Sequence, residues 1–489
     1  MPARQRISYV DTAWLRMDRP NNLMQIVGVM LFDGELDFAR LQRSIERRML
    51  SFRRFRQVVR QDDGVYYWED DLDFDLEHHL RRSVLPGARG KAELQRLVAD
   101  LASTPLNPAR PLWEMHLVET ALGGHALIMR IHHCIADGIA MVGVILSMAD
   151  ESPDRVSGEP LLELAEEDQD DFFGRLLFDA MLASIRISSN LWGKYVGLLS
   201  NPQKALEYAR IGSGVAVEVT KLAIMPNDSP TRFKGKPGTS KRVAWSERIS
   251  LPEVKAVGKV LGCSVNDLLL SAAAGALRDY LLDQGDPVDG VEIRAMVPVN
   301  LRRPRDMGKL GNRFGLVALE LPVGIENPLA RLYATRERME ALKGSYQAPI
   351  TLSILGAVGM APKFAQDMVL DLLASKATAV MTNVPGPQEA LYLAGARLRE
   401  PLFWVPQSGD IGMGVSILSY DNKVQFGLIT DKALVPDPER IVGRFASEFN
   451  KLLMLVLMEP WERLSDPLAV EAALAQLIPP FVGRQGSCP

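Results

Sequence analysis

Segments with strand character alternate with segments of helical character through the first 150 residues or so, which indicates an α/β fold. The run NLMQIVGVMLFDGEL predicts a buried strand that ends in an Asp-Gly turn. The next stretch, DFARLQRSIERRMLSFRRF, has helical spacing with one apolar face, made of Phe38, Leu41, Ile45 and Met49. After these, HALIMRIHH predicts a short strand, and GIAMVGVILSMAD predicts a helix.

A second α/β region runs from about Val243 to the end of the chain. It opens with LPEVKAVGKVLGCSVNDLLLSAAAGALRDYL, which predicts two helices joined by a glycine-containing turn. The runs IRAMVPVNLR and NKVQFGLITD predict strands. We therefore expect an N-terminal domain over residues 1–170, a connection over 171–242 and a C-terminal domain over 243–489.

The connection changes character along its length. Residues 151–171 hold nine acidic residues against the single Arg155, which predicts a solvated linker or flap. Residues 172–221 are helical and apolar, so they either pack in the core or form a surface helix on a lipid boundary. A basic loop follows, and at the other end of the chain we expect the tail beyond Ile478 to be loosely held.

Bulk composition excludes several classes of protein. Sixty acidic and fifty-six basic residues give a small negative net charge, which argues against nucleic acid as the main partner. Three cysteines without paired spacing argue against a disulfide scaffold or a thiolate zinc site, and they fit a reducing cytosol. The polar N-terminus has no signal-peptide core, and the longest charge-free run is broken by prolines, so we expect membrane contact to be peripheral.

All six histidines lie within the first 133 residues, and two of them begin the string HHCIADG. Neighbouring side chains of a strand point to opposite faces, so His132 and His133 separate. We assign His133, which lies nearer the strand end, to a cavity, while His132 packs inward and bonds the backbone. The other pair, His78 and His79, has no Asp-Gly downstream, and we expect it at the surface.

The residues of HHCIADG suit a site for general-base catalysis. Histidine suits proton abstraction near neutral pH because its unperturbed pKa is about 6.5. A hydroxyl activated by His133 can attack a thioester without a covalent enzyme intermediate. Asp137 has three possible roles: it caps the following helix, it pairs with an arginine, or it contacts a histidine. Gly138 allows either a positive φ or the close passage of a thin substrate arm.

The string resembles the active-site signature of the acyltransferase superfamily that includes chloramphenicol acetyltransferase, peptide-synthetase condensation domains and plant acyl-CoA-dependent acyltransferases. More narrowly, nearly the whole chain resembles the bacterial bifunctional wax ester synthase/diacylglycerol acyltransferase (WS/DGAT) family. The motifs that carry this likeness are PLWE, HHCIADG, KRVAWS, VNDLLLSAAAGALRDYL, VPVNLR, GNRFG and TNVPGP. The resemblance implies two chloramphenicol acetyltransferase-like α/β domains, each a mixed sheet flanked by helices, with the active-site tunnel at their interface.

The same resemblance implies roles for individual residues. His133 is the general base, and His132 supports it. Asp137 is structural and bridges to an arginine, for which Arg302 and Arg294 are the candidates. The second domain steadies the site through an Asn-Asp motif, which matches Asn266 and Asp267. The Asp-Phe-Gly-Trp-Gly motif of the plant enzymes is missing, and SGDIGMGVSILSY stands in a similar place.

Two further groups have a functional and a structural interpretation. The basic loop either docks the phosphates of coenzyme A or is a solvated interdomain linker; its candidate ligands are Lys234, Lys236, Lys241 and Arg242. The Pro-Gly-Pro of TNVPGP either holds Asn383 or Thr382 near the developing oxyanion or simply makes a rigid turn. Cys134 beside His133 is a poor nucleophile, because adjacent side chains diverge and free cysteines are mostly buried.

The function that this likeness implies is transfer of a long-chain fatty acyl group from acyl-CoA to a fatty alcohol or a diacylglycerol, as in wax ester and triacylglycerol biosynthesis. Acyl-CoA is a co-substrate, and neither cofactor nor metal is required. We expect a cytoplasmic protein, peripherally associated with the inner face of the cell membrane or with lipid droplets; the sequence does not give the oligomeric state. Three alternatives stay open: a condensation or polyketide-type enzyme using carrier-bound acyl groups, a glycerophosphate acyltransferase with His132 as base, and a non-catalytic lipid-binding protein.

Overall fold

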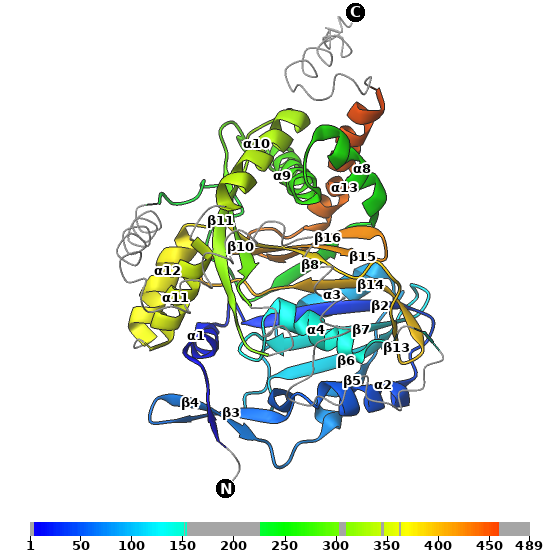
Figure 1. Ribbon diagram of the computed structural model, residues 1–489, viewed down its shortest axis with the longest axis vertical. Coiled ribbons are helices and arrows are strands. Elements are labelled where there is room, and N and C mark those ends of the chain that lie inside the picture. The colour runs from blue at the N-terminus through cyan, green and yellow to red at the C-terminus, as the bar shows by residue number, and fades with distance from the viewer. Residues whose placement is uncertain are drawn as a thin grey trace, which may run out of the picture.

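The computed structural model describes residues 4–150, 152–153, 225–302, 310–343, 347–360 and 363–458. These residues form two lobes, one above the other in Figure 1, and each lobe is built on one mixed sheet. The expected two-domain α/β architecture is therefore confirmed. The acidic linker apart from residues 152–153, the apolar segment 172–221 and the tail beyond Ile478 lie outside the described residues.

The first sheet has the strand order β13-β14-β2-β7-β6-β5, and only the β5–β6 pair is parallel. Its first-lobe strands are β2 (Gln25–Asp33), β5 (Leu80–Ser83), β6 (Trp113–Glu119) and β7 (His125–His132). Three helices belong to this lobe: α2 (Phe38–Ser44), α3 (Lys91–Ala102) and α4 (Gly138–Met148). As predicted, β2 ends in a turn at Gly34 with φ of 81°, and Leu41, Ile45 and Met49 of the expected apolar face are fully buried. The stretch expected to be helical is an α-helix only to Ser44 and continues as a π-helical turn over Ile45–Met49, and Phe38 is half-buried.

Two strands from the second half complete this first sheet. β13 (Tyr392–Leu393) and β14 (Ala396–Trp404) leave the second lobe, and β14 pairs antiparallel with β2. The chain then returns to the second lobe. The expected division into 1–170, 171–242 and 243–489 does not foresee this, because strand pairing joins residues 364 positions apart, such as Asp33 and Arg397.

The second sheet has the order β11-β10-β12-β15-β16-β8, with β9 on the edge of β16. Its strands are β8 (Lys241–Trp245), β9 (Ile249–Ser250), β10 (Ile293–Asn300), β11 (Phe314–Leu321), β12 (Ala379–Pro385), β15 (Met413–Tyr420) and β16 (Lys423–Asp431). Four helices cover its outer face in Figure 1: α8 (Leu251–Leu261), α9 (Val265–Asp283), α10 (Pro328–Lys343) and α13 (Glu439–Met458). As predicted, α8 and α9 are joined at a glycine, Gly262, which has φ of 65°. Helix α9 is apolar on nearly every side and is buried accordingly.

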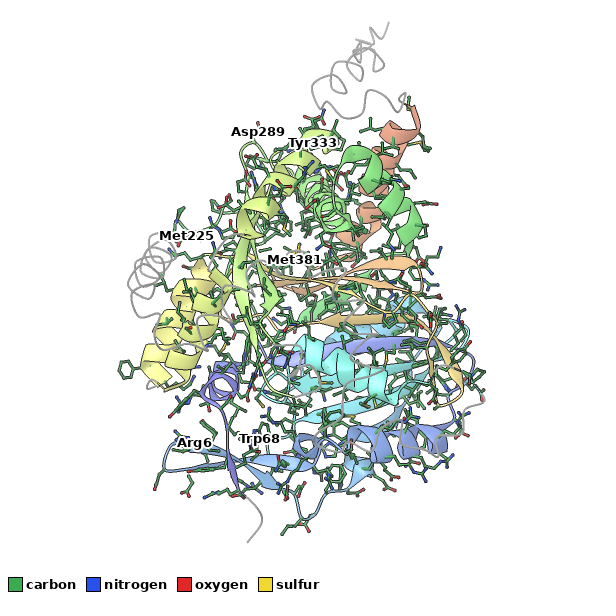
Figure 2. All side chains as sticks on the ribbon, in the orientation of Figure 1. Arg6, Trp68, Met225, Asp289, Tyr333 and Met381 are labelled. Carbon is green, nitrogen blue, oxygen red and sulfur yellow. The ribbon has the colours of Figure 1, made fainter. Side chains whose placement is uncertain are left out.

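The remaining elements lie beside the lobe junction and below it. Helix α1 (Tyr9–Met17) packs against α11 (Gln347–Met360), and α12 (Lys363–Ser375) lies beside them. A small antiparallel sheet is made of β1 (Gln5–Arg6), β3 (Gln57–Asp62) and β4 (Val65–Asp70), and the short helical turns are Ile45–Met49, Arg53–Arg56 and Leu76–His78. Figure 2 places Trp68 in this small sheet and Met381 of β12 in the middle of the molecule, and both side chains are fully buried.

Candidate active site

The two adjacent histidines separate at the end of β7. The backbone of His132 is the last of the strand, paired with Gln25 of β2, and the His133 N–H donates to the Met24 carbonyl at 2.7 Å. The Nδ1 atom of His132 accepts the backbone N–H of Cys134 at 3.2 Å, and its Nε2 lies 3.7 Å from an Asp18 carboxylate oxygen. His132 thus bonds the backbone, as predicted, and its proton must sit on Nε2.

The imidazole of His133 lies in an aromatic enclosure. The Trp14 ring of α1 stacks on it with centroids 4.2 Å apart and planes at 21°, and the Phe314 ring of β11 lies 5.5 Å away. The residue is only 2% exposed, and this burial lowers the pKa of His133 to about 4, although the Asp137 carboxylate opposes the shift. At neutral pH the ring is therefore uncharged and keeps a lone pair that can accept a proton.

Asp137 joins the two lobes. Its Oδ1 accepts the Ala140 N–H at 3.0 Å, which caps α4, and also the Arg302 Nη1 at 2.5 Å. Its Oδ2 accepts the backbone N–H of Arg313 at 3.0 Å. The side chains of the ion pair are 4% and 1% exposed. Of the two arginines predicted for this pairing, Arg302 is confirmed, whereas Arg294 pairs with Glu320 at 2.7 Å.

Gly138, the first residue of α4, does not adopt a positive φ, so that interpretation was wrong. The helix explains the difference, because its first residue needs an ordinary helical backbone. A Cβ at this position would meet only Val405, at 3.9 Å. A β-carbon would therefore fit there in ordinary contact, and the other interpretation, the passage of a thin substrate arm, stays a prediction.

Sequence reasoning missed the residues that surround the base from other elements. Besides Trp14, they are Asn312 and Asp11: the Asn312 amide donates to the His133 carbonyl at 2.7 Å and to Asp11 Oδ1 at 2.8 Å. The Arg54 guanidinium lies 3.5 Å from the other Asp11 oxygen and donates to the Ile135 carbonyl at 3.0 Å. The motif GNRFG, which contains Asn312, could have marked that residue as part of the site. No sequence pattern marks Trp14.

The Asn-Asp motif acts at the start of α9. Asp267 completes a capping box, since its carboxylate accepts the Ser264 N–H at 2.8 Å and its own N–H donates to the Ser264 hydroxyl at 3.2 Å. Asn266 accepts the Asn383 side-chain amide at 3.0 Å, so the structure brings two of the expected site residues together. The Thr382 hydroxyl, in contrast, donates to the Val415 carbonyl within the second sheet at 3.2 Å.

The basic loop does not present its four cations together. The Lys234 ammonium donates to the carbonyls of Ala374, at 2.9 Å, and Ala377. The Lys241 ammonium is buried and donates to the Asn21 carbonyl and the Asn22 side chain at 2.7 and 2.8 Å. For these two lysines the structure favours a linking role over a phosphate contact. Lys236 is exposed and Arg242 is half-buried, and their contact with coenzyme A stays a prediction.

The segment after β14 is anchored to the first lobe. The Asn22 amide donates to the Gly409 carbonyl at 2.6 Å and to the Ile411 carbonyl at 3.1 Å. Both carbonyls belong to SGDIGMG, the run that stands in place of the plant motif. This run therefore helps to fix the junction between the lobes.

Two other predictions from the sequence have clear outcomes. Cys134 is fully buried, and burial raises the pKa of its thiol well above the ordinary value, which disfavours a nucleophilic thiolate. His78 is exposed as expected, but the surface assignment of His79 was wrong. The His79 ring stacks between Phe74 and Trp113, and its Nδ1 bonds the Trp113 carbonyl at 2.7 Å. It is a core histidine with a satisfied nitrogen.

Within the described part of the chain, no single helix is both long and apolar enough to cross a bilayer. Helices α8 and α9 reach that length and apolarity only as a pair, and they meet at a bend of 100°.

Family models match both halves of the sequence. The model for the wax ester synthase/diacylglycerol acyltransferase catalytic domain matches residues 7–269, and the WS/DGAT C-terminal domain model matches residues 310–453. A similar curated relative is a probable diacylglycerol O-acyltransferase of Mycobacterium tuberculosis, 28% identical over 429 residues, or 84% of this chain and 87% of that protein. A putative diacylglycerol O-acyltransferase of the same organism is 25% identical over 477 residues, covering 92% and 90%.

Solved structures share the fold. The wax ester synthase/diacylglycerol acyltransferase from Marinobacter aquaeolei superposes with a TM-score of 0.65 and 22% identity, over 92% of this chain and 99% of that one. A starter condensation domain of rhizomide synthetase, solved in complex with C8-CoA, superposes with a TM-score of 0.55 and 12% identity, over 94% and 96%. The two-lobed architecture is thus common to this chain and to condensation domains.

Proposed function

The chain belongs to the wax ester synthase/diacylglycerol acyltransferase family, and from this premise we propose that it moves a long-chain fatty acyl group from acyl-CoA to the hydroxyl of a fatty alcohol or a diacylglycerol. Family membership makes the protein an acyltransferase rather than a non-catalytic lipid-binding protein. The observation that carries the mechanism is the uncharged, enclosed imidazole of His133 at the lobe junction.

In the proposed reaction, Nε2 of His133 takes the proton of the acceptor hydroxyl as its oxygen attacks the thioester carbonyl. A new C–O bond forms, the C–S bond breaks, and the proton passes to the departing sulfur, which leaves as the thiol of coenzyme A. No acyl-enzyme forms. The buried Cys134, whose thiol pKa is raised, supports this direct transfer.

The lobe junction is the proposed route for both substrates. His133 directly follows β7 of the first lobe, and Asn312 and Phe314 contact it from the second lobe. We propose that a channel between the lobes leads to this base. The absence of a β-carbon at Gly138, where one would touch Val405 at 3.9 Å, supports close passage of the acyl-CoA arm there. We further propose that Asn266 and Asn383 support the channel wall, that the oxyanion is held near Asn383, and that Lys236 and Arg242 meet the coenzyme A phosphates.

Both substrates prefer a lipid surface, so we propose that the protein works in the cytoplasm, peripherally attached to the inner face of the cell membrane or to lipid droplets. The rhizomide condensation domain, whose solved complex contains C8-CoA, supports acyl-CoA as a donor that this fold can accept. The same likeness keeps a carrier-bound donor as a second candidate.

The decisive experiment measures thiol release by the purified protein with palmitoyl-CoA and a panel of acceptors that includes hexadecanol and a diacylglycerol. His133→Ala is expected to lower kcat by roughly 10²–10⁴, the usual contribution of a general base. His78→Ala, at an exposed histidine of the same lobe, is the matched control and should keep full activity. Wild-type turnover by His133→Ala would rule out His133 as the general base. Faster turnover with palmitoyl-acyl-carrier protein than with palmitoyl-CoA would show that the acyl donor is carrier-bound.

A further inference from the structure

The indole of Trp14 covers one face of the His133 imidazole. The two ring centroids lie 4.2 Å apart with their planes at 21°, so the rings are stacked rather than joined edge to face. Phe314 is a second aromatic neighbour of His133, with centroids 5.5 Å apart, but its plane is tilted by 52°. Trp14 therefore presents the negative face of its π system to the imidazole, whereas Phe314 does not lie parallel to it.

Contacts from the second half of the chain hold this indole in place. Helix α1 lies beside α11 and α12 in Figure 1, and it packs on α11 so closely that a Cβ at Gly359 would collide with the Tyr9 carbonyl. The buried side chain of Gln366 in α12 donates from Nε2 to the Ala13 carbonyl, one residue before Trp14, at 2.9 Å. Trp14 itself is buried. The stacked arrangement therefore depends on helices that follow the second lobe's strands in the chain.

The proposed reaction makes His133 carry a charge in a buried site. The ring is uncharged at rest, because burial lowers the pKa of His133 to about 4. It becomes an imidazolium when it takes the proton of the acceptor hydroxyl. Asp137 favours that charge electrostatically, and His132 opposes it. A further group that favours the imidazolium without admitting water would lower the barrier to proton transfer.

We propose that Trp14 is a positioning residue, which keeps the imidazole of His133 in its working orientation and stabilises the imidazolium through a cation–π interaction. Indole is the best partner for a cation among the aromatic side chains, and the attraction requires the cation to lie over the ring face, as His133 does. Trp14 takes no part in the proton transfer itself. The inference rests on the proposed function, because it assumes that His133 becomes charged during turnover.

Fluorination of the indole tests the π face with little change in the size of the ring. Fluorine withdraws electron density, and mono-, di- and tetrafluorotryptophan can be placed at position 14 of the full chain by stop-codon suppression. The assay is the single-turnover rate of thiol release from palmitoyl-CoA with the fastest acceptor of the panel. We expect this rate to fall stepwise as fluorines are added, by roughly three- to tenfold in total.

The matched control is the same fluorinated series at Trp245, a fully buried indole of β8 whose aromatic neighbour is Trp404 at 6.2 Å. Its single-turnover rate should not change with the number of fluorines. A rate that is equally independent of fluorination at position 14 would overturn the proposal.

Natural side chains at position 14 separate the π face from simple packing. Trp14→Phe keeps a smaller aromatic face, and Trp14→Leu keeps an apolar side chain without one. We expect kcat to decrease from wild type to Trp14→Phe to Trp14→Leu, about tenfold in the last, with KM for palmitoyl-CoA changed less than about threefold. A folded Trp14→Leu with wild-type kcat would contradict the proposal. If Trp14→Leu does not fold, the fluorinated series decides alone.

The proposed function and this inference fail in different ways. If His133→Ala keeps full turnover, the proposed base is wrong whatever fluorination does. If His133→Ala is inactive while the rate is independent of fluorination at position 14, His133 remains the base and only the role assigned to Trp14 is lost.

Discussion

Removing the guanidinium of Arg302 is expected to destabilise the protein more than the loss of any surface ion pair. Arg302→Ala leaves the Asp137 carboxylate, 4% exposed, without the cation that lies 2.5 Å from it. Two backbone N–H groups remain bound to Asp137, but they carry no compensating full charge. Breaking one side of a buried ion pair costs about 3–5 kcal/mol, and the Arg302 bond to the Gly311 carbonyl is lost as well.

The assay is urea unfolding followed by intrinsic fluorescence, with the activity of each variant measured beside it. Arg397→Ala is the matched control: Arg397 lies 2.6 Å from Asp421, yet the two side chains are 43% and 26% exposed, so the loss should stay within about 1 kcal/mol. Asp137→Asn keeps a helix-capping oxygen and removes the charge. In the double variant Asp137→Asn/Arg302→Ala, the loss should be clearly smaller than the sum of the single losses.

A small effect would refute the reasoning. If Arg302→Ala and Arg397→Ala lower the free energy of unfolding equally, the buried pair does not hold the lobes together. Strict additivity of the Asp137 and Arg302 substitutions would lead to the same conclusion, since residues in contact should couple.

Two further predictions concern the base and its surroundings. The pKa of His133 is about 4 in the folded protein and about 6.5 when unfolded, so the unfolded chain binds more protons between these pH values. The free energy of unfolding should therefore fall by about 3 kcal/mol as pH drops from about 6.5 to about 4. In His133→Asn, the urea midpoint should depend less on pH over this range. An unchanged slope in His133→Asn would assign the acid sensitivity to other groups. Gly138→Val should change the urea midpoint of unfolding no more than a typical surface substitution does, but it should raise KM for palmitoyl-CoA at least tenfold. An unchanged KM would mean that the acyl-CoA arm does not pass beside Gly138.

The sequence predicted those parts of the fold that local pattern determines. Apolar spacing, caps and glycine turns predicted five elements where they occur: the strands β2 and β7 and the helices α4, α8 and α9. The placement of β14 in the first sheet was not foreseen. Its pairing with β2 depends on contacts between residues such as Trp404 and Val27, and single-segment periodicity contains no information about such a partner.

The same distinction holds for the candidate site. The helix cap at Asp137 could be predicted because it is local, and Arg302 was a candidate partner because the family resemblance implies an arginine there. Trp14 could not be found, since nothing in α1 indicates that its indole stacks on a histidine more than a hundred positions away. His79 failed for the opposite reason: its local sequence looks polar, and only the neighbouring rings of Phe74 and Trp113 show that it is buried.

The enclosure of His133 explains why both lobes are needed for one proton transfer. A base must be uncharged before it acts, and burial ensures this by lowering its pKa; however, the same burial opposes the imidazolium that forms during the reaction. Groups that favour the charged ring must therefore surround it without exposing it to water. Asp137 does so electrostatically from the first lobe, held by Arg302, while Asn312 does so from the second. An isolated first lobe would keep HHCIADG with its Asp137 but lose Arg302, which holds that carboxylate, and Asn312 and Phe314, which approach His133 from the second lobe. Its histidine would then have neither a dry environment nor a fully stabilised charged form.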